Sequence, residues 1–259
     1  MGKLKQYVSP SQLSKFKKCQ LLYKYIYVDN NDSPKGSIYS AYGSALHFVI
    51  ADYYNHQKEY NGKKGNFDEK RLKSVFTQSF SEEKEKLNGY PSNIAESLEF
   101  VGLAKIIGYV KEFGYKVKPL HVEFPFEIKL RTIDTTIRGI IDLITKDGMI
   151  IDHKTAGMTW KRTWNRNTVD TLDSLTFYAM AYRKLFGKKE KGVGVHVIPR
   201  TNKFELHEIY SHRTEQDILY VMRMIQAMDA VEKKNIFIPN RTECGNCDIK
   251  QICNKLPIL

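Results

Sequence analysis

Two aspartates and a lysine lie in a stretch of the sequence that has the pattern of a β-hairpin. Its two apolar strands, residues 137–145 and 149–155, flank a short turn that contains glycine, the residue that best tolerates a left-handed turn position. If the turn consists of the three residues between the strands, Asp142 lies directly opposite Asp152, and Lys154 shares their face of the sheet. The spacing therefore predicts two carboxylates and an ammonium group at one point of a buried sheet.

Two carboxylates at such a point could bind a divalent cation. They repel each other, and removing them from water is costly unless a positive charge lies between them. Lys154 offsets part of that cost, and a divalent cation would offset more of it. The alternative is a buried ion pair between Asp152 and Lys154 beside an unrelated aspartate, and this stretch alone does not decide between the two.

Four cysteines form a second set of candidate ligands. Cys244, Cys247 and Cys253 follow one another with Cys-x2-Cys-x5-Cys spacing, and Cys19 stands far from them in the sequence. In a reducing compartment structural disulfides are rare, and metal binding is the more common role of such a set. Four thiolates suit zinc or an iron–sulfur cluster, but a zinc ribbon usually supplies two close cysteine pairs.

The composition is that of a soluble globular protein. The chain has 259 residues, of which 42% are hydrophobic and 27% charged, enough for one large domain or two small ones. No apolar run approaches the roughly 20 residues that a membrane-spanning helix needs, and the first residues lack the apolar core of a signal peptide. We therefore expect an intracellular, cytoplasmic protein that does not enter a membrane.

The charge balance favours a polyanionic partner. Lysine and arginine number 41 against 29 aspartates and glutamates, which gives a formal net charge of +12. Such an excess is typical of nucleic-acid-binding proteins, although lysine-rich surfaces that only confer solubility are an alternative.

The segment before the hairpin has a helical pattern. Ser9, Pro10 and Gln12 are typical of a helix N-terminus, because serine caps, proline suits the first position and glutamine completes a capping box. A second helix is expected over residues 39–56 and contains His47, although a lone histidine in a helix is more often structural than a ligand. Further helices are expected near residues 67–87 and 94–113.

The hairpin is expected to belong to a larger sheet. Apolar and polar residues alternate over residues 120–130, which predicts a strand, and Pro125 within it suggests a sheet edge or a bulge. After the hairpin we expect a helix over 170–186 that ends at Gly187, strands near 192–199 and 204–209, and a long helix from Thr214.

Basic and aromatic residues alternate directly after the hairpin. Residues 157–167 are expected to form a loop that holds Lys161, Arg162, Trp164 and Arg166. Such a loop could neutralise phosphates and stack on bases, so we favour contact with DNA. An ordinary exposed loop with tryptophan anchors is the alternative.

Together these motifs resemble the RecB-like branch of the PD-(D/E)XK nuclease superfamily. Within it they are most similar to the iron–sulfur members, which are the CRISPR-adaptation exonucleases and the nuclease domain of AddB-type helicase–nucleases. The resemblance covers nearly the whole chain and keeps the order of the motifs. These are Ser9-Pro10-Ser11-Gln12-Leu13 with Phe16 and Cys19, Gly43-Ser44-Ala45-Leu46-His47, Gly139-Ile140-Ile141-Asp142, Asp152-His153-Lys154-Thr155, Tyr178, and Cys244, Cys247 and Cys253.

The resemblance implies an α/β fold of the restriction-endonuclease type. We expect a mixed β-sheet core flanked by helices, with a helical N-terminal portion and a cysteine-rich C-terminal tail. Residues 1–259 would form a single nuclease domain. Its parts would be a mainly helical part (1–115), a sheet core with the hairpin (116–210), and a helix with the cluster-binding tail (211–259).

The resemblance also implies a catalytic Mg²⁺ or Mn²⁺ ion. Its ligands would be His47, Asp142, Asp152 and the main-chain carbonyl of His153; oxygen ligands suit a hard cation, and the imidazole shifts the preference toward Mn²⁺. The ion would lower the pKa of a bound water and polarise the scissile phosphate. Lys154 would orient that water and counter the charge that builds on the phosphate.

Two further residues and the cysteines complete the implied sites. Glu123 is a candidate for holding a metal-bound water, and Tyr178 for contacting the DNA backbone; a surface carboxylate and a core aromatic are the respective alternatives. The four cysteines match the ligands of a structural [4Fe-4S] cluster, which would tie the first helix to the C-terminal tail.

The sequence departs from the family pattern at three positions. The glutamine that precedes Tyr178 in the family's Q-x-x-x-Y helix is replaced by Ser174, which is too short to reach the same partners. Gln20 stands where a proline often follows the first cysteine, and Asp152 stands where many relatives have glutamate. The first change affects how the helix orients DNA or the active-site lysine, and not metal binding.

From these motifs we predict a metal-dependent DNA nuclease. We expect an exonuclease that hydrolyses phosphodiester bonds of single-stranded DNA, with a helicase, a recombination protein or CRISPR-adaptation proteins as candidate partners. One alternative is a structure-specific DNA endonuclease. The other is a catalytically weak DNA-end-binding subunit of a larger complex, which the change at Ser174 would suit.

Overall fold

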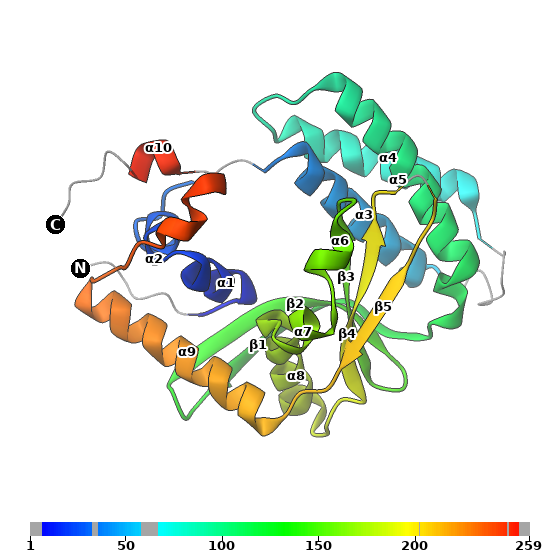
Figure 1. Ribbon diagram of the computed structural model, residues 1–259. Helices are drawn as coiled ribbons and strands as arrows, with labels where there is room; N and C mark the ends of the chain where they lie inside the picture. Colours follow the sequence, from blue (N-terminus) through cyan, green and yellow to red (C-terminus); the bar gives the residue numbers. More distant parts are fainter. Residues whose placement is uncertain (1–6, 33–35, 58–66, 202, 248, 254–259) are drawn as a thin grey trace.

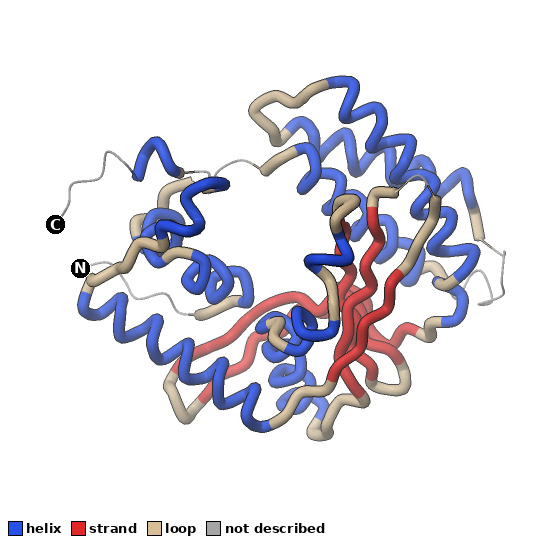
Figure 2. The backbone as a smooth tube through the Cα atoms, in the orientation of Figure 1, coloured by secondary structure: helices blue, strands red, loops and turns tan. Residues whose placement is uncertain are grey.

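The computed structural model describes residues 7–32, 36–57, 67–201, 203–247 and 249–253. Within them one sheet of five strands is flanked by helices (Figures 1 and 2). The strands are β1 (Pro119–Leu130), β2 (Thr135–Thr145), β3 (Met149–Ala156), β4 (Gly192–Pro199) and β5 (His207–Ser211). The longer helices are α1 (Pro10–Lys18), α3 (Ile38–Asn55), α4 (Glu69–Glu85), α5 (Ser92–Glu112), α8 (Asp173–Phe186) and α9 (Glu215–Lys234). The short ones are α2 (Gln20–Tyr23), η1 (Lys24–Val28), η2 (Gly114–Lys116), α6 (Trp160–Thr163), α7 (Arg166–Asp170), η3 (Arg241–Asn246) and α10 (Lys250–Cys253).

The sheet is mixed, as expected. The strands follow one another in the order β1-β2-β3-β4-β5. Neighbouring strands are antiparallel except β3 and β4, which are parallel and are joined by the segment that contains α6, α7 and α8. β1 is an edge strand, which explains why it accepts Pro125. The prediction of an α/β, restriction-endonuclease-like fold is confirmed.

Helices cover both faces of the sheet (Figure 1), and an apolar core lies between the helices and the sheet on each face. One core joins the sheet to α1, α8 and α9, and it contains Leu13, Tyr182 and Ile225. The other joins the sheet to α3, α4 and α5, and it contains Leu46 and Phe76. The hairpin contributes side chains to both cores, as the apolar character of both its faces predicts.

The predicted hairpin register is confirmed. Leu143 pairs with Ile151 and Ile144 pairs with Ile150, which is the register of a three-residue turn, and Gly148 has a positive φ of 87°. Beyond Leu143 the two strands separate. The N-terminal segment then pairs with β2, since the Val8 N–H donates to the Thr136 carbonyl (2.8 Å). The hairpin is therefore open on the side where its acids lie.

The start of α1 and the end of α8 follow the sequence signals, whereas other boundaries do not, including the start of the helix expected over 170–186, which is Asp173. Ser9 and Gln12 form the capping box of α1, and Gly187 ends α8 with a φ of 66°. The expected loop at 157–167 is wrong, because it contains α6 and the beginning of α7. The strand expected from 204 begins only at His207. None of the described helices is long and apolar enough to cross a membrane.

Candidate active site

Four elements bring the candidate site residues together at the open side of the hairpin. α3 supplies His47, β1 supplies Glu123, β2 supplies Asp142, and β3 supplies Asp152 and Lys154. His47 Nδ1 lies 3.3 Å from Asp142 Oδ2, and Lys154 Nζ lies 2.6 Å from Asp152 Oδ2. A helix imidazole, the hairpin acids and the hairpin lysine therefore meet at one place in the fold.

α3 can approach β3 closely because of a glycine. A Cβ atom at Gly43 would lie 3.1 Å from Thr155 Oγ1 of β3, which is tighter than ordinary van der Waals contact. His47 is one helical turn further along α3, on the same side of the helix. Glycine at this position therefore sets how closely the imidazole approaches the hairpin.

The Asp142 carboxylate replaces a missing strand hydrogen bond. Because the ladder between β2 and β3 ends at Leu143 and Ile151, the His153 main-chain N–H donates to Asp142 Oδ2 at 2.8 Å instead. Burial alone would raise the pKa of Asp142, but the contacts with His153 and His47 hold it well below its usual range. Asp142 is thus a permanently ionised group between the two strands, rather than a side chain projecting from one face.

Between neighbouring pairs of β1 and β2 residues, the side chains change from one face of the sheet to the other at this point. Val122 and Leu143, which pair, pack in the core under α3. Phe124 and Ile141, which also pair, pack in the core under α8. Residues two apart in a regular strand share a face, so both strands are locally irregular here, and the residue between Val122 and Phe124 has a left-handed backbone: Glu123 has a φ of 46°.

Glu123 is a strained acid beside an ionised one. The left-handed region is costly for a residue with a side chain, and it persists mostly where the surroundings enforce it, often at functional sites. Loss of water around the carboxylate and the nearby charge of Asp142 raise the pKa of Glu123 to about 7. A bound cation would relieve the repulsion between the two acids.

Asp152 and Lys154 form a buried acid–base pair. Only 1% of Asp152 is exposed, and burial raises its pKa to about 6 although Lys154 acts in the opposite direction. Its Oδ2 atom accepts no hydrogen bond of normal geometry from a described residue, despite the ion pair with Lys154. Burial would lower the pKa of Lys154, but Asp152 and Asp142 outweigh it and raise that pKa, so the lysine is charged at neutral pH.

α8 presents a tyrosine to the same acids. Tyr178 is 7% exposed, and burial, followed by the charges of Asp152, Asp142 and Glu123, raises its pKa. Its hydroxyl is therefore a neutral group within the field of the three carboxylates. One turn earlier, where relatives carry glutamine, the buried Ser174 hydroxyl has no hydrogen-bond partner among the described residues.

Sequence reasoning missed the residues that support the hairpin from the other face of the sheet. The ring of His153 is 3% exposed, and its Nε2 atom lies 3.0 Å from the Tyr109 hydroxyl of α5. That hydroxyl lies 2.7 Å from the Tyr54 hydroxyl of α3. Burial lowers the pKa of His153, so its ring is neutral. A histidine in a strand buried on both faces is the signal that a polar partner must exist there.

A surface groove opens at His47. It has a volume of about 610 Å³ and follows α3, with Glu123 of β1 on its other wall. Sequence reasoning also missed this groove, although the small residues on one face of the second helix were a signal. The lining residues are Ser40, Gly43, Ser44, His47, Phe48, Ala51, Asp52, Asn55 and Glu123.

Glu123, Asp142 and Asp152, together with His47, form what we call the acid cluster, and their side chains are of the types that bind a divalent cation. Three carboxylates and an imidazole are the donors that Mg²⁺ and Mn²⁺ accept. Loss of water and the charge of Asp142 raise the pKa of both Glu123 and Asp152, and a bound cation would offset that charge. As the side chains stand, no three histidine, cysteine, aspartate or glutamate residues in the described part of the chain are close enough to hold an ion between them. The side chains would have to close around it.

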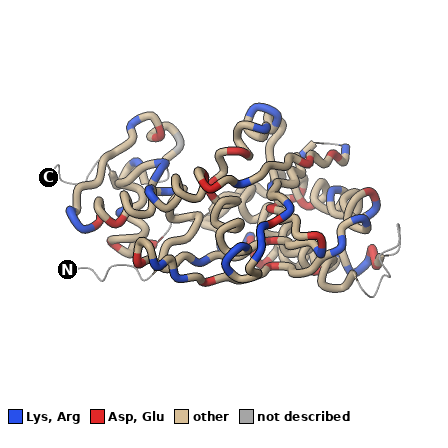
Figure 3. Tube along the Cα trace, turned by 90° about the horizontal axis from the view of Figure 1, so that it is seen from below, with Lys and Arg blue, Asp and Glu red and all other residues tan. Residues whose placement is uncertain are grey.

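The basic side chains after the hairpin lie on the surface of α6 and α7. Lys161, Arg162 and Arg166 are exposed, and Arg166 Nε lies 2.8 Å from Asp170 Oδ1. Trp164 is partly buried against the core under α8, so only part of its ring is available to a ligand. Lysine and arginine are spread over many segments of the chain, interspersed with acids (Figure 3). The positive charge is therefore distributed, and not confined to this segment.

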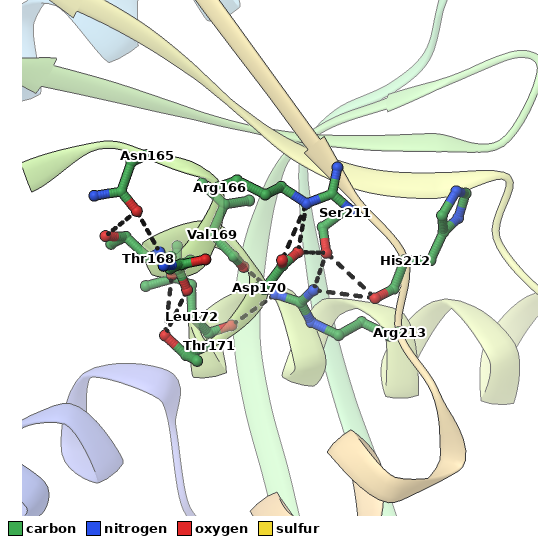
Figure 4. A network of polar contacts seen from close by, with 11 residues as sticks. Asn165, Arg166, Thr168, Val169, Asp170, Thr171, Leu172, Ser211, His212 and Arg213 are labelled. Atoms are coloured by element: carbon green, nitrogen blue, oxygen red, sulfur yellow. Dashed lines mark hydrogen bonds and ion pairs between the residues drawn. The ribbon is translucent and has the colours of Figure 1, made fainter. Parts of the chain in front are cut away.

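A buried arginine holds α7 in position (Figure 4). Arg213 is fully buried, and its guanidinium donates to the main-chain carbonyls of Val169 (2.6 Å) and Leu172 (3.2 Å). It also donates to the hydroxyls of Thr176 (3.0 Å) and Ser211 (2.8 Å). These bonds connect the end of α7, the first turn of α8 and the end of β5, and so fix the basic segment to the sheet.

The four cysteines line one small cavity between the two ends of the chain. The Asn240 main-chain N–H donates to Cys19 Sγ (3.4 Å), and Cys244 Sγ donates to the Asn240 carbonyl (3.8 Å). Burial, followed by the nearness of the other three thiols, raises the pKa of Cys253. Donors and spacing fit a thiolate-bound metal group, although the four sulfurs do not form a metal site as they stand.

Comparison with known proteins gives one family and twelve matching chains of solved structures, two of which are described here. The family model of the PD-(D/E)XK nuclease superfamily matches residues 7–254. The crystal structure of a protein from Eubacterium rectale named "Putative exonuclease" is 12% identical, with a TM-score of 0.58 over 98% of this chain and 90% of that chain. A second structure, of SSO0001, is 16% identical over 92% of this chain and 96% of that chain, but its TM-score of 0.31 supports no inference. No curated protein matches the chain.

Proposed function

Because this chain belongs to the PD-(D/E)XK nuclease superfamily, we propose that it hydrolyses phosphodiester bonds of DNA at the acid cluster. One observation carries the proposal: a histidine, three carboxylates and a lysine from four separate elements meet at the end of the hairpin ladder. A purely structural ion pair would need only Asp152 and Lys154. The remaining acids increase the repulsion that such a pair would have to overcome.

The proposed roles follow from the charge state of each group. A Mg²⁺ or Mn²⁺ ion, when bound, polarises the scissile phosphate and lowers the pKa of a water. His47, Asp142, Asp152 and the main-chain carbonyl of His153 are the residues that would hold it. Asp142 is ionised at any working pH, because it accepts the His153 N–H.

The remaining groups act on the phosphate and the water. Lys154 is charged and is anchored by Asp152, so it counters the negative charge that develops on the phosphate oxygens. Glu123 holds and orients the water, and Tyr178 donates its hydroxyl proton to a backbone oxygen of the DNA. The basic side chains of Lys161, Arg162 and Arg166, with Trp164, would contact the strand outside the cluster.

A nuclease assay with the full chain tests this proposal. Single-stranded and double-stranded DNA labelled at the 5′ or the 3′ end is incubated with Mn²⁺, with Mg²⁺ or without added metal. We expect metal-dependent cleavage, loss of cleavage in Asp152→Asn, and unchanged cleavage in Asp229→Asn, an exposed aspartate of α9. If Asp152→Asn cleaves as fast as the wild type, the assignment of the acid cluster is wrong.

The same assay separates the finer alternatives. We propose an exonuclease on single strands, for which the labelled ends would be released as short products. Internal cuts in a branched substrate would support a structure-specific endonuclease instead. Binding of DNA ends without turnover would support the weak binding subunit, to which the unpaired Ser174 hydroxyl lends weight.

We further propose that the cysteines hold a structural [4Fe-4S] cluster, as in the iron–sulfur branch of the superfamily. Support comes from the shared cavity and from the distance in sequence between Cys19 and the triplet, since a cluster there would join α1 to the tail. Protein purified without oxygen should be brown and contain iron and sulfide, and Cys247→Ser should lose both. Stoichiometric zinc in a colourless protein would overturn the assignment.

The whole chain is proposed to act as one nuclease domain within the cell. The family match over residues 7–254 supports a single unit. Helicase, recombination or CRISPR-adaptation proteins are the proposed partners, and affinity purification of the tagged full chain would test for them.

A further inference from the structure

The α3 residues that line the groove lie on one face of the helix. They recur every three or four positions from Ser40 to Asn55, which extends about 22 Å along the helix. His47 lies near the middle. A strand whose phosphate reaches His47 and Glu123 can therefore lie along this groove.

One aromatic side chain in the groove is exposed without a structural reason. Phe48, next to His47 in the sequence, is 60% exposed. The tyrosines of α3 at positions 42, 53 and 54 are at most 3% exposed, and Tyr39 is covered in part by the Arg200 guanidinium, 4.4 Å from its ring centre. Leaving a phenylalanine in water forgoes the stabilisation that its burial would give. Phe48 therefore contributes little to the fold as it stands.

The described residues that line the groove include no lysine or arginine that could bind a phosphate. Of its two carboxylates, Asp52 is held by Arg71, with Nε 3.0 Å and Nη2 2.7 Å from its oxygens. A strand in the groove must therefore be held by uncharged contacts, for which the Phe48 ring, two serine hydroxyls and the Asn55 amide are available.

Such contacts favour an unpaired strand. In a duplex the faces of the bases are covered by their neighbours, whereas a base in a single strand can lay its face on an aromatic ring. Small residues, namely Gly43, Ser44 and Ala51, line the same groove as Phe48. It can therefore admit a ring beside the phenylalanine.

We propose that Phe48 is a stacking platform for an unpaired base, and that this platform makes the enzyme select single strands. The inference rests on the proposed function, because the groove is a substrate path only if cleavage occurs beside His47. Phe48 would hold the strand next to the reacting phosphate without taking part in the reaction.

Binding of a short single-stranded oligodeoxynucleotide that carries 2-aminopurine tests the proposal. The full chain is titrated without added divalent cation, with the strand alone and with the strand paired to its complement. We expect Phe48→Ala to lose about tenfold in affinity for the single strand, with duplex affinity unchanged, and Phe48→Trp to retain both. Ser44→Trp, which fills the groove, should also weaken single-strand binding.

Phe100 of α5 is the matched control, because it is 78% exposed and lies outside the groove. Phe100→Ala should bind both probes as the wild type does, and thermal unfolding should show that all variants remain folded. The proposal is wrong if Phe48→Ala binds the single strand within twofold of the wild type. It is also wrong if single-strand and duplex binding fall equally, or if Phe48→Trp is as weak as Phe48→Ala.

Cleavage rates separate this inference from the proposed function. If the wild type cuts DNA with Mn²⁺ and Phe48→Ala keeps the same ratio of single-strand to duplex rates, the inference fails and the proposed function stands. If the wild type cuts no DNA, yet single-strand binding depends on Phe48, the proposed function fails and the stacking platform stands as a binding site.

Discussion

The affinity of the acid cluster for Mn²⁺ should fall steeply below neutral pH. In the metal-free protein the pKa of Glu123 is raised to about 7 and that of Asp152 to about 6. A protonated carboxyl does not bind the ion. The affinity for Mn²⁺ is therefore highest at a pH above both pKa values, and it falls as the pH is lowered through them. Asp142, whose pKa is well below its usual range, stays ionised throughout.

The size of the effect depends on how many of the acids hold the ion. Protonation of Asp152, whose pKa is about 6, raises the dissociation constant about 11-fold between pH 8 and pH 5, in addition to the effect of protonating His47. If Glu123 also binds the ion, its pKa of about 7 adds a factor of about 90, so that the two carboxyls together contribute about a thousandfold. The two cases are easily told apart.

Calorimetric titration of wild type and Glu123→Gln with Mn²⁺ at several pH values would measure this difference. Burial would lower the pKa of His47, but Asp142 outweighs it and raises that pKa, so His47 adds a dependence of the same sign in both proteins. The difference between the two therefore isolates Glu123, and Glu127→Gln, on the same exposed face of β1, is the control. Equal slopes in wild type and Glu123→Gln would show that Glu123 does not bind the ion, and an affinity for Mn²⁺ that does not change with pH would refute the whole cluster.

Three further predictions follow from the buried groups. Asp152→Asn should raise the melting temperature of the metal-free protein in calorimetry, because burial disfavours its charged form; a lower melting temperature would contradict this. Tyr109→Phe should weaken Mn²⁺ binding about tenfold, since the hydroxyl orients the hairpin histidine, whereas Tyr90→Phe, an exposed tyrosine, should not. Arg213→Met should lower the free energy of unfolding in urea by about 3 kcal/mol or more, because it leaves buried carbonyls without donors; a loss below about 0.5 kcal/mol, typical of a surface change, would show that the network is not needed.

The sequence was most informative where the signals were local. The turn glycine at position 148 and the two apolar strands that flank the three-residue turn determined the hairpin register, and therefore which residues of the two strands are opposite. The capping box at Ser9 and Gln12 marked the start of α1 in the same way. Each of these signals depends on residues a few positions apart, so no knowledge of distant contacts was needed.

The orientation of the acids could not be predicted from local signals. An ideal antiparallel ladder would place Asp142 and Asp152 side by side on one face, but the ladder ends one residue earlier and the first carboxylate turns toward the His153 N–H. On the separated part of β2, Val8 from a distant part of the chain forms a parallel bridge with Ile137, a contact that no local signal indicates. No local signal indicates the left-handed backbone of Glu123 either.

The tryptophans of the basic segment show the same limit. Their pattern indicated an exposed, base-stacking loop, but Trp160 is 7% exposed and lies against the His207 ring, with 3.6 Å between ring centres. Its partner comes from β5, more than forty residues later in the chain, where the sequence gives no signal of such a contact. Tertiary packing therefore overrode a local pattern.

The contact between the two ends of the chain has a consequence for biosynthesis. The Lys18 carbonyl accepts a hydrogen bond from the Asn240 side chain, 222 residues later, and Gln20 accepts one from the Ile238 main-chain N–H. At a translation rate of about 5–20 residues per second, the first helix must wait roughly 10–40 s for these partners to be made. Until then Lys18, Cys19 and Gln20 lack these partners, although the apolar side of α1 can already pack on the sheet and α8.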